Sequence, residues 1–363
     1  MRFGRPRRIG RAIAMLVIVA GISATVRAVW SNGLFSSTPV GFLGSCKVVG
    51  TVPGVQDIEA ANGTAFVSVS SARGPSADDG IYAISLAGGA LRKLAGGPRD
   101  FHPRGIGLYR TPDGKGLFLM AVNKRSGGAS AGAGAINNNG RFSIDSFEVT
   151  DPAGTPALVA QGTIEGGMLI NPQDVAVASP VSFYVANGTA GKNPLLHIPQ
   201  TYGVIPGGNI LYFNGMSFSE AVDGLYGTRS LILTGGGTHL VVGGLLSRSL
   251  TSFSREPFTG ALTEAGNLML PAGPEKLSLD AQGQLWVAGH ANLSDWRAAN
   301  ADPAKRAPSQ LFRVTLLNGV PQDKEQVYGN DGGELSGASV GISAGKTLLI
   351  GSSLDGRLLN CTQ

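Results

Sequence analysis

Two cysteines are the residues whose type and position most directly predict a reaction. Cys46 and Cys361 lie near opposite ends of the 363-residue chain, and the sequence contains no other cysteine. In an exported chain, one distant pair most simply forms one disulfide, which joins the first segment to the last. The alternative is two unrelated buried thiols. A disulfide of this kind favours a closed, circular β architecture and carries no information about catalysis.

Other chemistry is sparse in the linear sequence. It has no His-Glu-x-x-His helix and no cysteine-rich metal motif. If both cysteines are oxidised, no thiol nucleophile remains. A catalytic centre must therefore be assembled from residues that are far apart in the sequence, on elements that bring them together.

Short apolar or alternating runs indicate strands throughout the chain after residue 30, and no long helical periodicity interrupts them. Turn signals such as Asn62-Gly63 and Asp113-Gly114 precede several runs. A loop rich in Gly, Ala and Asn is expected over residues 126–140. The clearest strands are residues 65–70, 81–86, 116–123, 182–187, 209–213, 239–245, 284–289, 310–316 and 347–351.

A loose unit of strand, turn, strand and polar break recurs roughly every 40–50 residues, which is typical of β-propellers, and the chain holds about six such units. We therefore predict an all-β fold: a six-bladed β-propeller closed by a terminal disulfide, Cys46–Cys361. The propeller is expected to occupy residues 44–363 as one domain, after a linker over 31–43. A pair of β-sandwiches is the competing interpretation.

The first 30 residues predict export. Arginines between Arg2 and Arg11 precede an apolar run over residues 12–26, and Val26-Arg27-Ala28 is a weak cleavage candidate. The segment is either a cleaved signal peptide or a retained membrane anchor, and both place the globular part in the periplasm or outside the cell. Its six arginines account for the basic character, because removing them from the net charge of +5 leaves −1. No basic footprint for nucleic acid remains.

Ordered motifs give the chain a resemblance to the paraoxonase/arylesterase family over roughly residues 44–363. The resemblance implies a six-bladed propeller that hydrolyses esters or lactones. It also implies two calcium ions in the central tunnel, one structural and one that polarises the substrate carbonyl. The motifs that carry it, in order, are Val55-Gln56-Asp57-Ile58-Glu59, Phe101-His102-Pro103-Arg104-Gly105-Ile106, Asn171-Pro172-Gln173-Asp174-Val175, Leu285-Trp286-Val287-Ala288-Gly289-His290 and Leu335-Ser336-Gly337-Ala338-Ser339, followed by Cys361.

The structural calcium site implied by the resemblance is largely retained. Its positions read Asp57, the backbone carbonyl of Ile106, and Asp174. Calcium takes six to eight oxygen ligands, which two carboxylates, a carbonyl and waters supply. The alternative is that both aspartates pair with nearby cations or cap turns. We expect at most this one structural Ca²⁺ as a cofactor.

The catalytic calcium site implied by the resemblance is replaced. The five ligand positions of the family read Gln56, Gln173, Arg229, Glu275 and Lys276. Arg and Lys have no lone pair for a metal, and their charge would repel one. A catalytic Ca²⁺ is therefore not expected.

The family's paired histidines are replaced as well, by Arg104 and Lys124, while His290 keeps a family histidine near the tunnel mouth. Fixed cations can stabilise an oxyanion without a metal. The alternative is a buried salt-bridge network in a decayed site. We take as catalytic candidates Glu275, Lys276, Arg229, Arg104, Lys124 and His290, and as substrate-binding candidates Gln56, Gln173 and Asn187.

Two classes of function remain open at this stage. The first is an ester or lactone hydrolase of the arylesterase type that uses Arg and Lys charge in place of calcium. The second is a non-hydrolytic ligand-binding or scaffold propeller, or an enzyme of another reaction type in the same tunnel. In both classes the expected partner is a small, anionic molecule, with the membrane as a further partner if the N-terminal segment is uncleaved.

Overall fold

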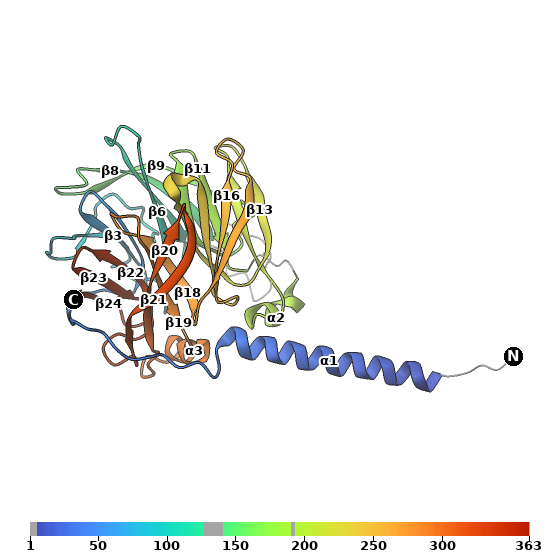
Figure 1. The fold of residues 1–363 in the computed structure, drawn as a ribbon. Coiled ribbons are helices and arrows are strands. Elements are labelled where there is room, and N and C mark those ends of the chain that lie inside the picture. The colour runs from blue at the N-terminus through green and yellow to red at the C-terminus, as the bar shows by residue number, and fades with distance from the viewer. Residues whose placement is uncertain (1–5, 127–140, 190–192, 363) are drawn as a thin grey trace.

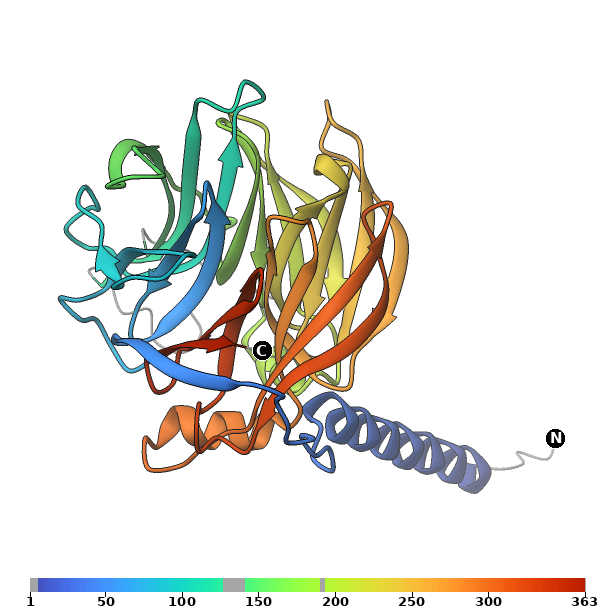
Figure 2. The ribbon, with the colours of Figure 1, turned by 60° about the vertical axis from the view of Figure 1, so that its left-hand side comes forward.

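The strands form a ring of six four-stranded antiparallel sheets. The computed structural model describes residues 6–126, 141–189 and 193–362, so nearly all of the loop expected over 126–140 lies outside the described residues. Within the described residues the first strand of each sheet contacts the first strand of the next, and the sixth contacts the first. Figures 1 and 2 show these sheets arranged as the blades of a propeller. The prediction of an all-β, six-bladed propeller is confirmed.

The first five blades follow the chain from the centre of the ring outwards, and the sixth takes its outer strand from the N-terminal side. The blades are β2 (Val55–Ala61), β3 (Thr64–Val69), β4 (Gly80–Ser85) and β5 (Arg92–Lys93); β6 (Pro103–Arg110), β7 (Leu117–Lys124), β8 (Phe142–Thr150) and β9 (Ala157–Ile164); β10 (Pro172–Ser179), β11 (Ser182–Asn187), β12 (Gly208–Phe213) and β13 (Phe218–Leu225); β14 (Thr228–Thr234), β15 (His239–Gly244), β16 (Ser249–Arg255) and β17 (Leu262–Met269); β18 (Gly273–Leu279), β19 (Leu285–His290), β20 (Ser309–Leu317) and β21 (Val320–Asn330); and β22 (Ala338–Ala344), β23 (Thr347–Ser352), β24 (Arg357–Thr362) and β1 (Ser45–Thr51).

The sixth blade joins the two ends of the propeller. Its outer strand, β1, comes from the N-terminal side and pairs antiparallel with β24, so that Cys46 lies opposite Cys361. The two cysteines form the predicted disulfide. Because the bond closes a loop of more than 300 residues, the chain-entropy account gives it on the order of 5 kcal/mol of stability.

The tight turns follow from the residues that punctuate the strands. Asn62 and Gly63, between β2 and β3, both have positive φ, at 52° and 75°. That pair of angles is the type I′ turn that matches the twist of a two-residue hairpin. Apolar side chains from adjacent blades pack against each other, as Phe66 of β3 does with Leu119 of β7. The core is thus distributed between the blades, and the central axis is left to polar residues.

The three α-helices of the described residues lie on one side of the ring, where Figures 1 and 2 show α1 projecting away from the propeller. They are α1 (Pro6–Asn32), α2 (His197–Thr201), which follows a short helix η1 (Pro194–Leu196), and α3 (Leu293–Ala301); η2 (Gly235–Gly237) lies between β14 and β15. The end of α1 contacts the propeller: Arg27 donates to the carbonyl of Gly203, and Arg297 of α3 donates to Asn32. The stretch Ala12–Asn32 is long and apolar enough to cross a membrane.

Candidate active site

All six innermost strands share one irregularity, which builds the site. Each has a shift in pairing register within its first residues, the mark of a β-bulge. A bulge redirects a side chain that regular alternation would place elsewhere. The bulged residues are Gln56, Arg104 with Gly105, Gln173, Arg229, Glu275 and Ser339. Five of these positions were selected from the sequence; Ser339 was not.

A cavity of about 450 Å³ lies at this end of the central tunnel. It brings together most of the residues that the sequence singled out, although they come from five different blades. It does not include Asn187 or His290. The predicted residues that line it are Gln56, Arg104, Lys124, Gln173, Arg229, Glu275 and Lys276.

The ammonium group of Lys276 lies at the centre of the ring between two buried carboxylates. Its Nζ is 3.2 Å from Asp174 Oδ1 and 3.5 Å from Asp57 Oδ2, and it donates to the carbonyl of Gln173 at 2.8 Å. Gly105 lets the second blade lie close to Asp174 of the third, because a Cβ at that position would be 2.1 Å from Asp174 Oδ1. The three charges belong to three blades, so the cluster ties the blades together at the axis.

The central carboxyls have raised pKa values. Burial raises the pKa of Asp57, and burial together with the charge of Asp57 raises that of Asp174 well above its usual range; Lys276 acts in the opposite direction on both. The pKa of Glu59, two residues along β2, is also raised well above its usual range by burial and by the charges of both aspartates. The centre therefore contains more carboxyl groups than cations.

The donor set does not fit the structural calcium that the resemblance implies. Asp57 accepts from the backbone N–H groups of Ile58 and Ile106, and Asp174 accepts from those of Val175 and Leu231. The ammonium of Lys276 lies where a metal would have to contact both carboxylates, and its charge would repel one. Within the described residues, no group of three or more His, Cys, Asp or Glu side chains is placed to hold a metal ion.

The guanidinium of Arg229 forms a second cluster, in the wall of the cavity. Its Nε donates to Glu275 Oε2 at 2.9 Å, its Nη2 lies 2.7 Å from Glu275 Oε1, and its Nη1 donates to Gln173 Oε1 at 2.6 Å. This is the paired geometry in which Arg binds a carboxylate most strongly. Burial raises the pKa of Glu275, but the charge and hydrogen bond of Arg229, together with the effects of His290 and Lys276, lower it by more, so the pKa lies below its usual value. Glu275 is therefore ionised at neutral pH.

His290 and Asn187 lie behind the cavity. Burial lowers the pKa of His290 to about 4, so its ring is neutral at pH 7. The ring packs beside Trp296, and its Nε2 is 3.7 Å from Glu275 Oε2. Asn187 is fully buried and donates to the carbonyl of Met168 and to Asn209. The structure thus places both among the packing of the blades, away from the space open to a ligand.

Three cations at the rim have a different environment. Arg104 donates from Nη1 to Asn171 Oδ1 and to the carbonyl of Pro172. Its guanidinium and that of Arg141 both lie over the ring of Phe142, at 5.3 and 5.5 Å from the centroid. Lys124 lines the same cavity. Among the described residues, no carboxylate lies within ion-pair distance of Arg104, Lys124 or Arg141.

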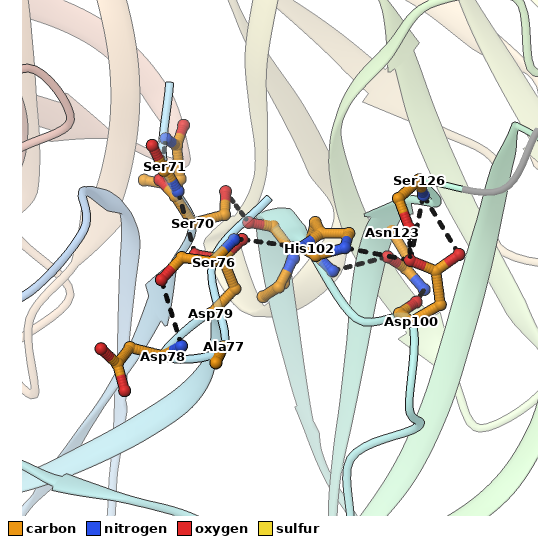
Figure 3. Close-up of polar contacts among 12 residues, drawn as sticks. Ser70, Ser71, Ser76, Ala77, Asp78, Asp79, Asp100, His102, Asn123 and Ser126 are labelled. Carbon is orange, nitrogen blue, oxygen red and sulfur yellow. Dashed lines mark hydrogen bonds and ion pairs between the residues drawn. The ribbon is translucent and has the colours of Figure 1, made fainter. Parts of the chain in front are cut away.

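A histidine that the sequence analysis did not select lies in the cavity wall. Figure 3 shows the His102 ring between Asp79 and Asp100. Nδ1 is 2.6 Å from Asp79 Oδ2, and Nε2 is 3.0 Å from Asp100 Oδ1. Both contacts are hydrogen bonds only when each ring nitrogen carries a hydrogen, since carboxylates accept. The sequence places Asp79 and His102 in different blades, so no local signal pairs them.

A short helix also contributes to the site without having been predicted. Helix α3 is capped by Asn292, whose side chain accepts from the N–H groups of Ser294 and Asp295. Its Trp296 lines the cavity and lies 5.5 Å from the Arg229 guanidinium. The available signal was Asn292 followed by an acidic residue in the first turn, which is typical of a helix start.

Comparison with known proteins agrees with this architecture. A sequence model described as Arylesterase matches residues 135–362, more than half of the chain. The chain belongs to the arylesterase family. Rat serum paraoxonase/arylesterase 2 (Rattus norvegicus) is 23% identical over 334 residues, covering 88% of this chain and 89% of that protein. The human protein of the same name (Homo sapiens) is 23% identical over 263 residues, covering 72% and 69%.

A solved structure assigned as a gluconolactonase has a TM-score of 0.50 to this arylesterase-family chain, with 15% sequence identity, and covers 90% of this chain and 96% of its own. At that identity the likeness shows the propeller fold alone. The family assignment, by contrast, places the chain among the arylesterases.

Proposed function

We propose that this protein hydrolyses a small ester or lactone at the mouth of its tunnel without a catalytic calcium ion. The family supplies the class of reaction. The observation that supports hydrolysis without a metal is that basic side chains occupy calcium-ligand positions implied by the family resemblance. Lys276 lies between Asp57 and Asp174, and Arg229 is held between Glu275 and Gln173.

In the proposed reaction, water attacks the carbonyl carbon, the acyl C–O bond breaks, and an acid and an alcohol form. The Glu275 carboxylate accepts the proton of the attacking water and returns it to the leaving alkoxide. Arg104, which has no carboxylate partner among the described residues, stabilises the oxyanion. Lys276 stays with its two aspartates and sets the charge beneath the site.

The test is hydrolysis of a panel of esters and lactones before and after exhaustive treatment with a chelator. We expect turnover that the chelator leaves unchanged and that Glu275→Gln and Arg104→Gln each reduce by at least tenfold. Turnover that disappears with the chelator and returns with calcium would contradict the proposal.

A second candidate, ligand binding without hydrolysis, is favoured by one specific contact. Both carboxylate oxygens of Glu275 already contact Arg229 nitrogens, which makes the carboxylate a weak base. If this candidate holds, ligands bind in the cavity, Glu275→Gln leaves their affinity nearly unchanged, and no product forms. Measuring binding and product formation on the same samples separates the two functions.

We further propose that residues 44–363 form an exported domain and that residues 1–30 direct its export. Two features support this: the apolar stretch at the start of the chain, and the Cys46–Cys361 disulfide, which needs an oxidising compartment. Mass determination of the mature N-terminus together with membrane fractionation distinguishes a cleaved signal from a retained anchor. Recovery of reduced, full-length protein from the cytosol would contradict export.

A further inference from the structure

We propose that the rim of the cavity is a binding site for an oxyanion and that the ligand is a small organic molecule carrying a carboxylate or a phosphate group. The site consists of Arg104, Lys124 and Arg141, which come from the second blade and its loop. The proposal deepens the proposed function and rests on it for the reaction, but its binding step is measured independently.

The other cations of the cavity wall have carboxylate partners, whereas these three have none among the described residues. Arg229 pairs with Glu275, Arg125 with Glu165, Lys276 with Asp57 and Asp174, and His102 with Asp79 and Asp100. Asp79 and Glu275 are the carboxylates that line the cavity within the described residues, and both already have partners. Arg104, Lys124 and Arg141 therefore form a cluster of cations at the rim that no carboxylate of the described residues contacts directly.

The sequence next to Arg125 and Arg141 supplies no further charged partner. Residues 127–140 adjoin Arg125 and Arg141 in the sequence but lie outside the described residues. Their sequence, Gly-Gly-Ala-Ser-Ala-Gly-Ala-Gly-Ala-Ile-Asn-Asn-Asn-Gly, contains no ionisable side chain. This segment therefore supplies no carboxylate that could pair with Arg104, Lys124 or Arg141.

The three cations are close enough to disfavour one another's charge. Burial and the charges of Arg229 and Arg141 lower the pKa of Arg104 to about 10. Burial and the charges of Arg104 and Arg141 also lower the pKa of Lys124. A bound oxyanion relieves this repulsion, because each guanidinium and the ammonium can then donate to it.

The surroundings limit the rest of the ligand. The cavity volume of about 450 Å³ suits a small molecule. The guanidinium groups of Arg104 and Arg141 lie over the ring of Phe142, and Trp296, which also lines the cavity, lies beside the guanidinium of Arg229. A ligand with an anionic group at the rim therefore directs its uncharged part towards Trp296 and Glu275, where the proposed hydrolysis takes place.

The experiment is calorimetric titration of the full-length protein with benzoate, benzamide and inorganic phosphate. Benzoate and benzamide have nearly the same shape and differ in charge. We expect benzoate and phosphate to bind and benzamide to bind at least tenfold more weakly. Lys124→Gln and Arg141→Gln should each weaken benzoate binding by about tenfold. These two rim cations are chosen because Arg104 also has a role in the proposed hydrolysis. The matched control is Arg313→Gln, since Arg313 pairs with Glu325 on the outer strands and lies far in sequence and blade from the rim.

Equal affinity for benzoate and benzamide, or variants at Lys124 and Arg141 that bind both anions like the parent, would overturn the rim site. Tighter binding of phosphate than of benzoate identifies a phosphate-bearing ligand, and the reverse identifies a carboxylate. The failure of the rim site differs from the failure of hydrolysis. Anion binding without turnover leaves the rim site standing, whereas turnover of neutral esters without anion binding leaves only the proposed hydrolysis.

Discussion

The centre and the rim of the tunnel both carry cations, but only the centre supplies them with carboxylates. Lys276 contacts Asp57 and Asp174, and Glu59 adds a third carboxyl nearby. At the rim, Arg104, Lys124 and Arg141 have no carboxylate within ion-pair distance among the described residues. A basic side chain is thus part of an ion-pair cluster at the centre, whereas at the rim it has no carboxylate partner within ion-pair distance.

This difference separates two uses of charge in one fold. A buried cation with two carboxylates is costly to break, because removing one partner leaves the others uncompensated. A partly exposed cation among other cations lowers the free energy of unfolding through charge repulsion. Binding of an anionic ligand relieves that repulsion. We therefore read the centre as the part that holds the blades together and the rim as the part that recognises a ligand.

The largest expected effect comes from removing the central cation. Lys276→Met leaves Asp57 and Asp174 buried without their cation and should lower the free energy of unfolding by about 3–5 kcal/mol. The matched change at the rim, Arg104→Gln, should leave stability nearly unchanged or raise it, since it removes a repelled charge. Urea unfolding of both variants measures the contrast. Similar losses in the two variants would remove the distinction between centre and rim.

How far the sequence predicts this arrangement depends on distance along the chain. The turn signals, the strand runs and the two cysteines are local or terminal features, and they predicted the propeller and its closure. Gln56, Arg104, Gln173, Arg229 and Glu275 were identified from the resemblance to paraoxonase/arylesterase motifs, and the structure places each at the bulge of a different inner strand. The bulges themselves have no signal in the sequence that was recognised.

The partners of those residues were not readable. Lys276 has a long flexible stem, and only the fold shows that its ammonium reaches carboxylates on two other blades. His102 was overlooked because Asp79 comes from the preceding blade. Trp296 was overlooked because α3, a helix of nine residues, interrupts an otherwise all-strand pattern.

The second effect is a pH dependence of stability from His290, behind the centre. Its folded pKa of about 4 lies below its ordinary value of 6.5, so between these values the unfolded chain binds a proton that the folded chain does not. The stabilisation is fully present above pH 6.5 and is lost as the pH falls towards 4, by up to roughly 3 kcal/mol.

The control for this effect is His290→Gln, which cannot titrate. Asp57 and Asp174 have raised pKa values, so their stabilisation is lost in the opposite direction, as the pH rises. The parent protein and His290→Gln both contain these aspartates. Subtracting the pH dependence of the unfolding free energy of one from that of the other therefore isolates the effect of His290. We expect the difference in unfolding free energy to shrink between pH 6.5 and 4; parallel curves would show that His290 is not protonated on unfolding in this range.

A smaller effect tests whether the centre is a metal site with a side chain in place of the metal. Lys276→Asn removes the ammonium and adds an amide oxygen beside Asp57, Asp174 and the carbonyl of Gln173. Four oxygens and waters form a calcium donor set. The variant should gain about 2.7 kcal/mol of stability at a calcium concentration one hundred times its Kd.

The parent protein is the control for the calcium titration, and its melting temperature should not change with calcium or with a chelator. Lys276→Met provides the second control, because it lacks both the ammonium and the new oxygen. Stabilisation of the parent by calcium would mean that a metal displaces Lys276 from the carboxylates. Absence of stabilisation in Lys276→Asn would mean that the pocket cannot contract around a cation.

The smallest effect concerns the rim, where the charges are partly exposed and therefore open to screening by salt. Raising the ionic strength from about 0.01 M to about 1 M shortens the Debye length from about 30 Å to about 3 Å. Benzoate affinity should fall by roughly tenfold over this range, whereas the unfolding free energy that depends on Lys276 should change little, because the central charges are buried. Arg104→Gln should reduce the salt dependence of binding, since it removes one of the charges that salt screens. If stability and anion affinity depend on salt equally, then the centre is as open to solvent as the rim, and the two regions do not use charge in different ways.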